Sequence, residues 1–201
     1  KVEELLSQMT VEEKLGYIGG IDWMYTKSID RLGIHRMRMS DGPQGIGTKG
    51  KSTAYPATVT LAATWNENLA YQYGKALGRD CRARNINVIL GPAVNIYRAP
   101  MCGRNFEYMG EDPYLTSRIC VGYIKGVQDQ GVMATVKHFV ANNSDYDRNN
   151  ISNDIDERTL NEIYFPAYKA AIQEAEVGAI MTSYNLMNGI YTTENPWLLK
   201  E

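Results

Sequence analysis

The chain has 201 residues, of which 44% are hydrophobic and 22% charged, and its formal net charge is −2. These values are typical of a globular domain, and nothing basic is concentrated enough to favour nucleic acid or an anionic membrane. The sequence has no run of about 18 apolar residues, so we expect no membrane-spanning helix. Lys1 to Leu6 are polar and helical in type, unlike a signal peptide. A signal peptide that is cleaved off would not be seen here, so a periplasmic, secreted or cytoplasmic location all stay open.

The chain contains 3 cysteines and 2 histidines. An odd number of cysteines without a C-x-x-C pair argues against a zinc site. We therefore expect Cys81, Cys102 and Cys120 to be small buried thiols, and we expect neither a metal nor an organic cofactor.

Helical and strand-like segments alternate along the chain. Thr10 and Glu13 form a capping box for an N-terminal helix, which Gly19 and Gly20 end. A short strand at 37–39 precedes a Ser-Asp-Gly-Pro turn. Further strands are predicted at 88–90, 132–136 and 179–181, and helices at 66–84, from Asp112-Pro113, from Glu157 with a break at Pro166, and after Asn195-Pro196.

This alternation predicts a parallel sheet with crossover helices. Polar residues follow each predicted strand: Ser40-Asp41 after the first, Asn95 shortly after the second, Lys137-His138 after the third and Ser183-Tyr184-Asn185 after the fourth. A (β/α)₈ barrel places its active site there, and an open doubly wound sheet also binds ligands there, so the pattern alone leaves both open. Four strands are too few for a closed barrel of about 250 residues. We expect an incomplete barrel that continues beyond Glu201.

Residues Gly45 to Ser52 match G-x-x-x-x-G-K-S, the phosphate-binding loop of P-loop nucleotide-binding proteins. That loop requires a strand immediately before it and a helix immediately after it. Here Asp41-Gly42-Pro43 interrupts the preceding strand, and Thr53 to Pro56 do not favour a helix start. A surface loop is the better interpretation, and nucleotide binding is a remote alternative.

Two charged residues allow both a structural and a functional interpretation. Asp41 could hydrogen-bond its own turn, or its carboxylate could accept two hydroxyl hydrogen bonds from a sugar. Arg104 could pair with Glu107 or Glu111, or present its planar donors to a hydroxyl-rich ligand. The segment 91–111 is long and polar for a simple loop, and such loops are often functional. The local sequence does not decide which role Arg104 has.

The Lys137-His138 pair follows a buried apolar run, where an unpaired ammonium group would be costly. Lys137 could form a buried ion pair with a nearby Asp, or Lys137 and His138 could both donate hydrogen bonds to a ligand at the floor of a pocket. The following segment, Asn142 to Asp145 with Arg148, is dense in hydrogen-bonding groups. A polyhydroxylated ligand suits such a surface better than an apolar one.

Several of these segments resemble glycoside hydrolase family 3, in the β-glucosidase-like group, and the resemblance is collinear over nearly the whole chain. It rests on eight segments: Leu6-Ser7-Gln8-Met9-Thr10 with Glu12-Glu13-Lys14, Met39-Ser40-Asp41-Gly42-Pro43, Gly91-Pro92-Ala93-Val94-Asn95-Ile96, Gly103-Arg104-Asn105-Phe106-Glu107-Tyr108, Val136-Lys137-His138-Phe139 with Asn142-Asn143, Asp156-Glu157-Arg158-Thr159-Leu160, Ser183-Tyr184-Asn185, and Glu194-Asn195-Pro196-Trp197-Leu198-Leu199.

The resemblance implies a (β/α)₈ barrel followed by an α/β sandwich domain, with residues 1–201 forming the N-terminal portion of the barrel. It implies exo-acting, retaining hydrolysis of terminal β-linked sugars. No catalytic carboxylate is expected in this chain, because the family's nucleophile Asp would lie beyond Glu201 and the general acid in the second domain. The residues implied to contact the −1 sugar are Asp41, Arg104, Lys137, His138, Arg148 and Tyr184.

These matches favour a β-glucosidase whose substrate is a small or oligomeric β-glucoside. A β-xylosidase of the same family and a non-catalytic sugar-binding relative are the alternatives. The residues 1–201 alone are expected to be inactive, because retaining hydrolysis needs two carboxyl groups.

Overall fold

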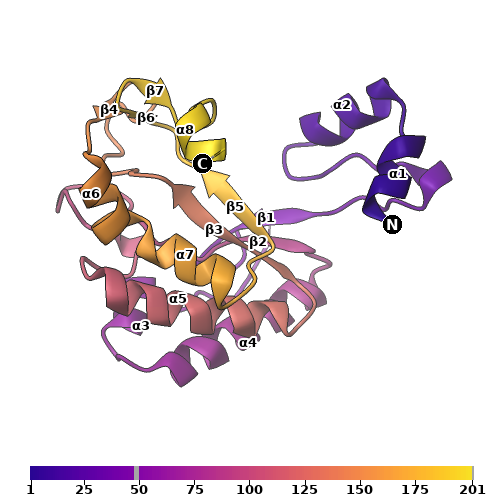
Figure 1. The fold of residues 1–201 in the computed structure, drawn as a ribbon. Helices are drawn as coiled ribbons and strands as arrows, with labels where there is room; N and C mark the ends of the chain where they lie inside the picture. The colour runs from indigo at the N-terminus through magenta and orange to yellow at the C-terminus, as the bar shows by residue number, and fades with distance from the viewer. Residues whose placement is uncertain (48–49, 201) are drawn as a thin grey trace.

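The computed structural model describes residues 1–47 and 50–200. Within them, four parallel strands form a sheet in the order β1-β2-β3-β5, which follows their order in the chain. The strands are β1 (Met39–Asp41), β2 (Val88–Leu90), β3 (Met133–Phe139) and β5 (Ala179–Thr182) (Figure 1). Because all four point the same way, their carboxyl ends meet at one edge of the sheet.

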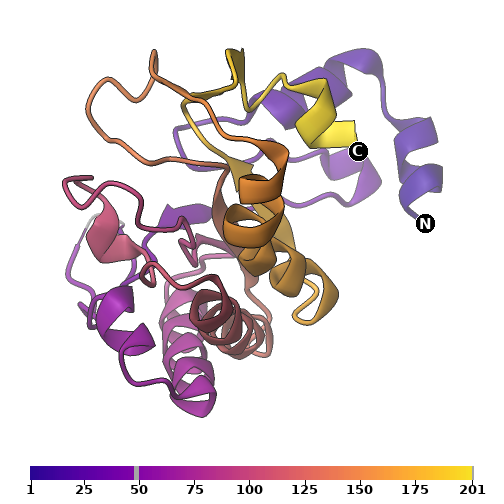
Figure 2. The same cartoon turned by 60° about the vertical axis from the view of Figure 1, so that its left-hand side comes forward.

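Helices join consecutive strands and cover one face of the sheet (Figures 1 and 2). Asn66 caps α4 and Asp112 caps α5, each through a side-chain oxygen that accepts a backbone N–H of the first turn. These crossover helices are α3 (Thr58–Ala62), α4 (Glu67–Ala83), α5 (Pro113–Gln128), α6 (Glu157–Thr159) and α7 (Pro166–Gln173), with a π-helical turn at Leu160–Tyr164. The expected break at Pro166 is thus confirmed.

The core lies between the sheet and helices α4, α5 and α7. Ile89, Ala134 and Val136 from the strands are fully buried against Leu77 of α4 and Ile124 of α5. Helices α4 and α5 pack very closely, and glycines occupy their contact: a Cβ atom on Gly126 would lie 2.1 Å from the carbonyl oxygen of Tyr71. Close packing of the crossover helices fixes the strands, and so the residues at their carboxyl ends.

The N-terminal segment contains α1 (Val2–Gln8), α2 (Val11–Gly19) and a 3₁₀ turn at Asp30–Leu32. The capping box of Thr10 and Glu13 and the end of α2 at Gly19 are confirmed. Neither helix has a buried residue, and both lie apart from α3 to α7 in both views (Figures 1 and 2). Across the described residues, no helix has the length and apolar character needed to cross a membrane.

A second small sheet, which the sequence pattern did not predict, lies beyond the carboxyl ends of β3 and β5. It pairs β4 (Ser152–Asn153) in parallel with β6 (Leu186–Met187), and β6 antiparallel with β7 (Ile190–Tyr191). Helix α8 (Pro196–Lys200) follows, as expected after Asn195-Pro196. This sheet ties the loop after β3 to the loop after β5.

The expected ends of two strands need correction. β1 extends to Asp41 and β3 extends to Phe139, so Asp41 and the Lys137-His138 pair end strands instead of following them. In α4, Ala70, Gly74 and Leu77 face the core, whereas Leu69 is 43% exposed. The three cysteines are buried and unpaired, as expected.

Candidate active site

The carboxyl ends of neighbouring strands bring a lysine and an aspartate together. Nζ of Lys137, on β3, lies 2.8 Å from Oδ1 of Asp41, at the end of β1. The side chain of Lys137 is 1% exposed, whereas that of Asp41 is 57% exposed. The ion pair makes the buried ammonium tolerable, and the exposed carboxylate can still accept hydrogen bonds from a ligand.

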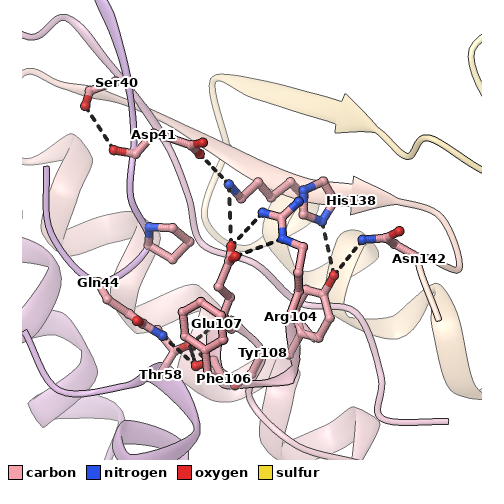
Figure 3. Close-up of polar contacts among 12 residues, drawn as sticks. Ser40, Asp41, Gln44, Thr58, Arg104, Phe106, Glu107, Tyr108, His138 and Asn142 are labelled. Atoms are coloured by element: carbon pink, nitrogen blue, oxygen red, sulfur yellow. Dashed lines mark hydrogen bonds and ion pairs between the residues drawn. The ribbon is translucent and has the colours of Figure 1, made fainter. Parts of the chain in front are cut away.

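Glu107 lies beside this pair, in the 3₁₀ turn η2 (Asn105–Glu107). Its two oxygens accept hydrogen bonds from Nε–H and Nη2–H of Arg104, at 2.8 Å each. This is the bidentate geometry of an arginine–carboxylate pair. Oε2 of Glu107 also lies 3.7 Å from Nζ of Lys137. Asp41, Lys137, Glu107 and Arg104 therefore form a row of alternating charges (Figure 3).

Both alternatives for Arg104 and Lys137 are thus compatible with the geometry. Arg104 pairs with Glu107 through one edge of its guanidinium, and within the described part of the chain the other edge keeps N–H donors for a ligand. Burial lowers the pKa of Arg104, but the hydrogen bonds and charge of Glu107 outweigh it, and the pKa is raised overall. Arg104 is a permanent, oriented cation.

His138 lies on β3 next to Lys137 and is 1% exposed. Its Nδ1 lies 3.4 Å from the hydroxyl of Tyr108, which accepts a hydrogen bond of 2.9 Å from the amide of Asn142 (Figure 3). Burial, together with the charges of Arg104, Lys137 and Arg148, lowers the pKa of His138 from 6.5 to about 2. The imidazole is therefore neutral at any physiological pH.

A register shift in β3 accompanies this arrangement. Lys137 pairs with Met181 and Phe139 with Thr182, so His138 has no counterpart on β5. The peptide bonds between Lys137 and His138 and between Phe139 and Val140 are cis. In a regular strand, successive side chains point to opposite faces, whereas both Lys137 and His138 contribute to the same polar cluster.

Arg148 and Tyr184 extend the group from His138. Nη1 of Arg148 donates to Asp145 at 2.9 Å, and its guanidinium carbon lies 4.1 Å from the centroid of the Tyr184 ring. The ring of Tyr184 lies 6.0 Å from that of His138. All six residues expected to contact sugar thus belong to one connected group; whether each of them contacts sugar stays a prediction.

Hydrogen bonds also hold the loop that carries Arg104 and Glu107. The amide of Gln44 donates to the carbonyl oxygen of Phe106, and the hydroxyl of Thr58 donates to that of Glu107 (Figure 3). Beside Asp41, a hollow of about 240 Å³ is lined by Pro43, Gln44 and Phe106. Phe106 is 53% exposed and forms an apolar wall next to the charged row.

The segment that matches a phosphate-binding loop has a different context from that motif. Residues 48–49 of Gly45–Ser52 lie outside the described residues. The preceding strand ends at Asp41, and the next described helix begins at Thr58. The described residues contain no group of three or more His, Cys, Asp or Glu side chains that could hold a metal ion.

The sequence pattern did not assign roles to three residues of this site. Glu107 was considered only as a partner for Arg104, yet it also faces Lys137. Tyr108 and Asn142 belong to recognisable motifs, but only the fold brings them to His138. Alternating cations and carboxylates around a neutral histidine can hydrogen-bond the closely spaced hydroxyls of a sugar.

Residues 12–201 match the glycosyl hydrolase family 3 N terminal domain, so the chain belongs to this family. Its fold is accordingly the N-terminal portion of a (β/α)₈ barrel, which the described residues do not close.

Among curated relatives, a β-glucosidase from Rhizobium radiobacter is 46% identical over 98% of this chain. The structure of a β-glucosidase from Kluyveromyces marxianus in complex with glucose superimposes on 100% of the chain with a TM-score of 0.97 and 40% identity. That of β-glucosidase 3B from Thermotoga neapolitana in complex with α-D-glucose covers 99% of it, with a TM-score of 0.93 and 38% identity. The chain spans 25%, 25% and 31% of these proteins, respectively.

Proposed function

We propose that the protein containing this chain is a retaining, exo-acting β-glucosidase that removes terminal, non-reducing β-D-glucosyl residues. Residues 1–201 supply much of the floor of the −1 sugar subsite. The glucose complexes of two similar β-glucosidases support this substrate class. The observation that carries the proposal is the connected row of Asp41, Lys137, Glu107 and Arg104 beside the neutral His138.

In this proposal, six side chains bind the hydroxyl groups of one sugar ring. Asp41 accepts hydrogen bonds from two hydroxyl groups on its exposed carboxylate, while Lys137 holds that carboxylate in place. Arg104 and His138 donate to neighbouring oxygens, and Arg148 with Tyr184 closes the opposite side. The six residues are Asp41, Arg104, Lys137, His138, Arg148 and Tyr184.

The two reacting carboxyl groups come from the polypeptide beyond Glu201 in this proposal. The nucleophile is an Asp on the next barrel strand, and the general acid belongs to a second α/β sandwich domain. A retaining mechanism requires these groups to lie about 5–5.5 Å apart, on either side of the bond that breaks. The sugar-binding floor positions the anomeric carbon between them and strengthens its hydrogen bonds in the transition state.

The test is turnover of aryl β-D-glucoside and aryl β-D-xyloside by the full-length protein, with the first product anomer read by NMR. We expect release of β-D-glucose with retention, and a higher kcat/KM for the glucoside. A higher kcat/KM for the xyloside would show that the protein is a β-xylosidase. If neither sugar is released although glucose binds, the protein is a sugar-binding relative and the enzymatic proposal is wrong.

A further inference from the structure

Three tyrosines, Tyr108, Tyr168 and Tyr184, lie close to His138. The hydroxyl of Tyr168 donates to its backbone carbonyl oxygen at 2.7 Å, and the ring of Tyr184 lies 6.0 Å from the imidazole. The ring of Tyr108 meets the imidazole edge-on at an interplanar angle of 81°. Tyr168 thus holds the backbone at His138 and Tyr108 meets the ring, while the neutral imidazole carries one proton, on either Nδ1 or Nε2.

A chain of two hydrogen bonds determines that position. The amide Nδ2 of Asn142 donates to the hydroxyl oxygen of Tyr108 at 2.9 Å. The hydroxyl has one proton of its own to donate. Besides Asn142, the other side-chain atom within hydrogen-bonding distance among the described residues is Nδ1 of His138, at 3.4 Å. The assignment that gives the Tyr108 hydroxyl proton an acceptor among these side chains has Tyr108 donate to a lone pair on Nδ1, which places the imidazole proton on Nε2.

The orientation of the Asn142 amide agrees with this direction. Its Oδ1 is buried without a partner in the described part of the chain, whereas Nδ2 is bonded. An under-satisfied carbonyl oxygen is more common in proteins than an orphaned buried N–H group. Burial raises the pKa of Tyr108, so its hydroxyl keeps the proton that it donates.

Nε2 of His138 is the ring nitrogen left for a ligand. Among the described residues, Nδ1 has Tyr108 as its hydrogen-bond partner and Nε2 has none. We propose that Asn142 and Tyr108 act as positioning residues that hold His138 in the Nε2–H tautomer, so that Nε2–H donates to a sugar hydroxyl. The sugar in this statement rests on the proposed function; the tautomer does not.

The tautomer can be measured directly in the full-length protein labelled with ¹⁵N-histidine. The two ring-nitrogen shifts of His138 are assigned by their loss in His138→Gln. We expect the Nε2–H pattern in the unaltered protein, and an Nδ1–H pattern would overturn the proposal. Neutron diffraction on the unaltered protein gives the same answer without any variant.

Two substitutions test the chain of hydrogen bonds. Tyr108→Phe removes the donor to Nδ1, so a substantial Nδ1–H population should appear and kcat/KM for the aryl β-glucoside should fall about tenfold, as for one lost hydrogen bond. Asn142→Asp replaces the amide donor by an acceptor of the Tyr108 proton, which should convert His138 to the Nδ1–H tautomer.

The matched control is Tyr164→Phe. Tyr164 is also buried and accepts the amide of the neighbouring Asn143 at 2.9 Å, but it forms no hydrogen bond with His138. We expect this variant to keep the Nε2–H pattern. If Tyr108→Phe also leaves the pattern unchanged, Tyr108 does not set the tautomer. A protein that shows the expected tautomers but no glucoside turnover would contradict the proposed function and leave the positioning role intact.

Discussion

Lys137 shows how a charged residue can lie inside this fold. Its side chain is 1% exposed, and its charge is balanced by Asp41 at 2.8 Å and Glu107 at 3.7 Å. Asp41 is exposed and Glu107 is shared with Arg104, so neither carboxylate alone neutralises the ammonium group. A buried charge that loses a partner is strongly destabilising, which makes each member of this row depend on the others.

Replacing Asp41 by Ala should therefore raise KM and lower kcat for an aryl β-glucoside. The variant loses an acceptor for hydroxyl groups and one partner of Lys137, and hydrogen bonds to charged groups contribute roughly 1.5–3 kcal/mol each, so kcat/KM should fall about 100-fold or more. Asp129→Ala is the control, because Asp129 follows α5, at the opposite end of the strands. Unchanged kinetics for Asp41→Ala would remove Asp41 from the sugar site.

Glu107 is the second prediction at this scale. Glu107→Gln keeps the shape of the side chain but removes the charge between Arg104 and Lys137, so we expect kcat/KM to fall by roughly 100-fold. Glu107→Asp keeps the charge and should restore part of this loss. Steady-state kinetics, with a thermal melt for each variant, separates the two effects. Equal losses in both variants at unchanged stability would show that charge is not what Glu107 provides.

His138 should make the protein less stable in mild acid. Its pKa is lowered to about 2 in the folded protein from an ordinary value of 6.5, so between these values the unfolded chain binds a proton that the folded one does not. Stability is then lost as the pH falls below about 6.5, by about 2 kcal/mol between pH 7 and pH 5.

The measurement is urea unfolding at pH 7 and pH 5 of the full-length protein and of His138→Gln. The variant should lose about 2 kcal/mol less than the unaltered protein on acidification. His35→Gln is the matched control, since His35 is the other histidine of the chain and is exposed. The same pH dependence in all three proteins would show that burial of neutral His138 does not contribute.

At the scale of the elements, the alternation of strands and helices was predictable because it depends on local patterns. The apolar run 88–90 and the Asp112-Pro113 cap lie where the sequence placed them. The ends of β1 and β3 were not predictable, since Asp41 and Lys137 pair with neighbouring strands and with each other across 96 residues of sequence. The contact of Tyr108 with His138 also joins segments 30 residues apart, which no local pattern encodes.

The contact between α4 and α5 gives the prediction at this scale. A Cβ atom on Gly126 would lie 2.1 Å from the Tyr71 carbonyl oxygen and 2.7 Å from the backbone nitrogen of Lys75. Because backbone cannot yield as a side-chain end does, Gly126→Ala should destabilise the protein by about 3 kcal/mol. Chemical unfolding measures this. Gly19→Ala, where nothing lies within 4 Å, should change stability by less than about 1 kcal/mol.

At the scale of the whole molecule, the described residues leave several surfaces open. β5 has a strand partner on one side only, and Ile180 on it is 40% exposed. On α2, Leu15 is 65% and Ile18 is 84% exposed. Open strand edges and apolar surface favour association between chains. In the proposed enzyme, the remaining barrel strands and the second domain lie beyond Glu201.

A polypeptide restricted to residues 1–201 should therefore associate in solution and hydrolyse no aryl β-glucoside. Among the described carboxylates of the site, Asp41 is paired with Lys137, Glu107 with Arg104 and Asp145 with Arg148, and retaining hydrolysis needs a free nucleophile and an acid. Light scattering and an activity assay, with the full-length protein as the positive control, test both parts. Turnover by the pure, restricted polypeptide would place the nucleophile within residues 1–201 and contradict the assignment beyond Glu201.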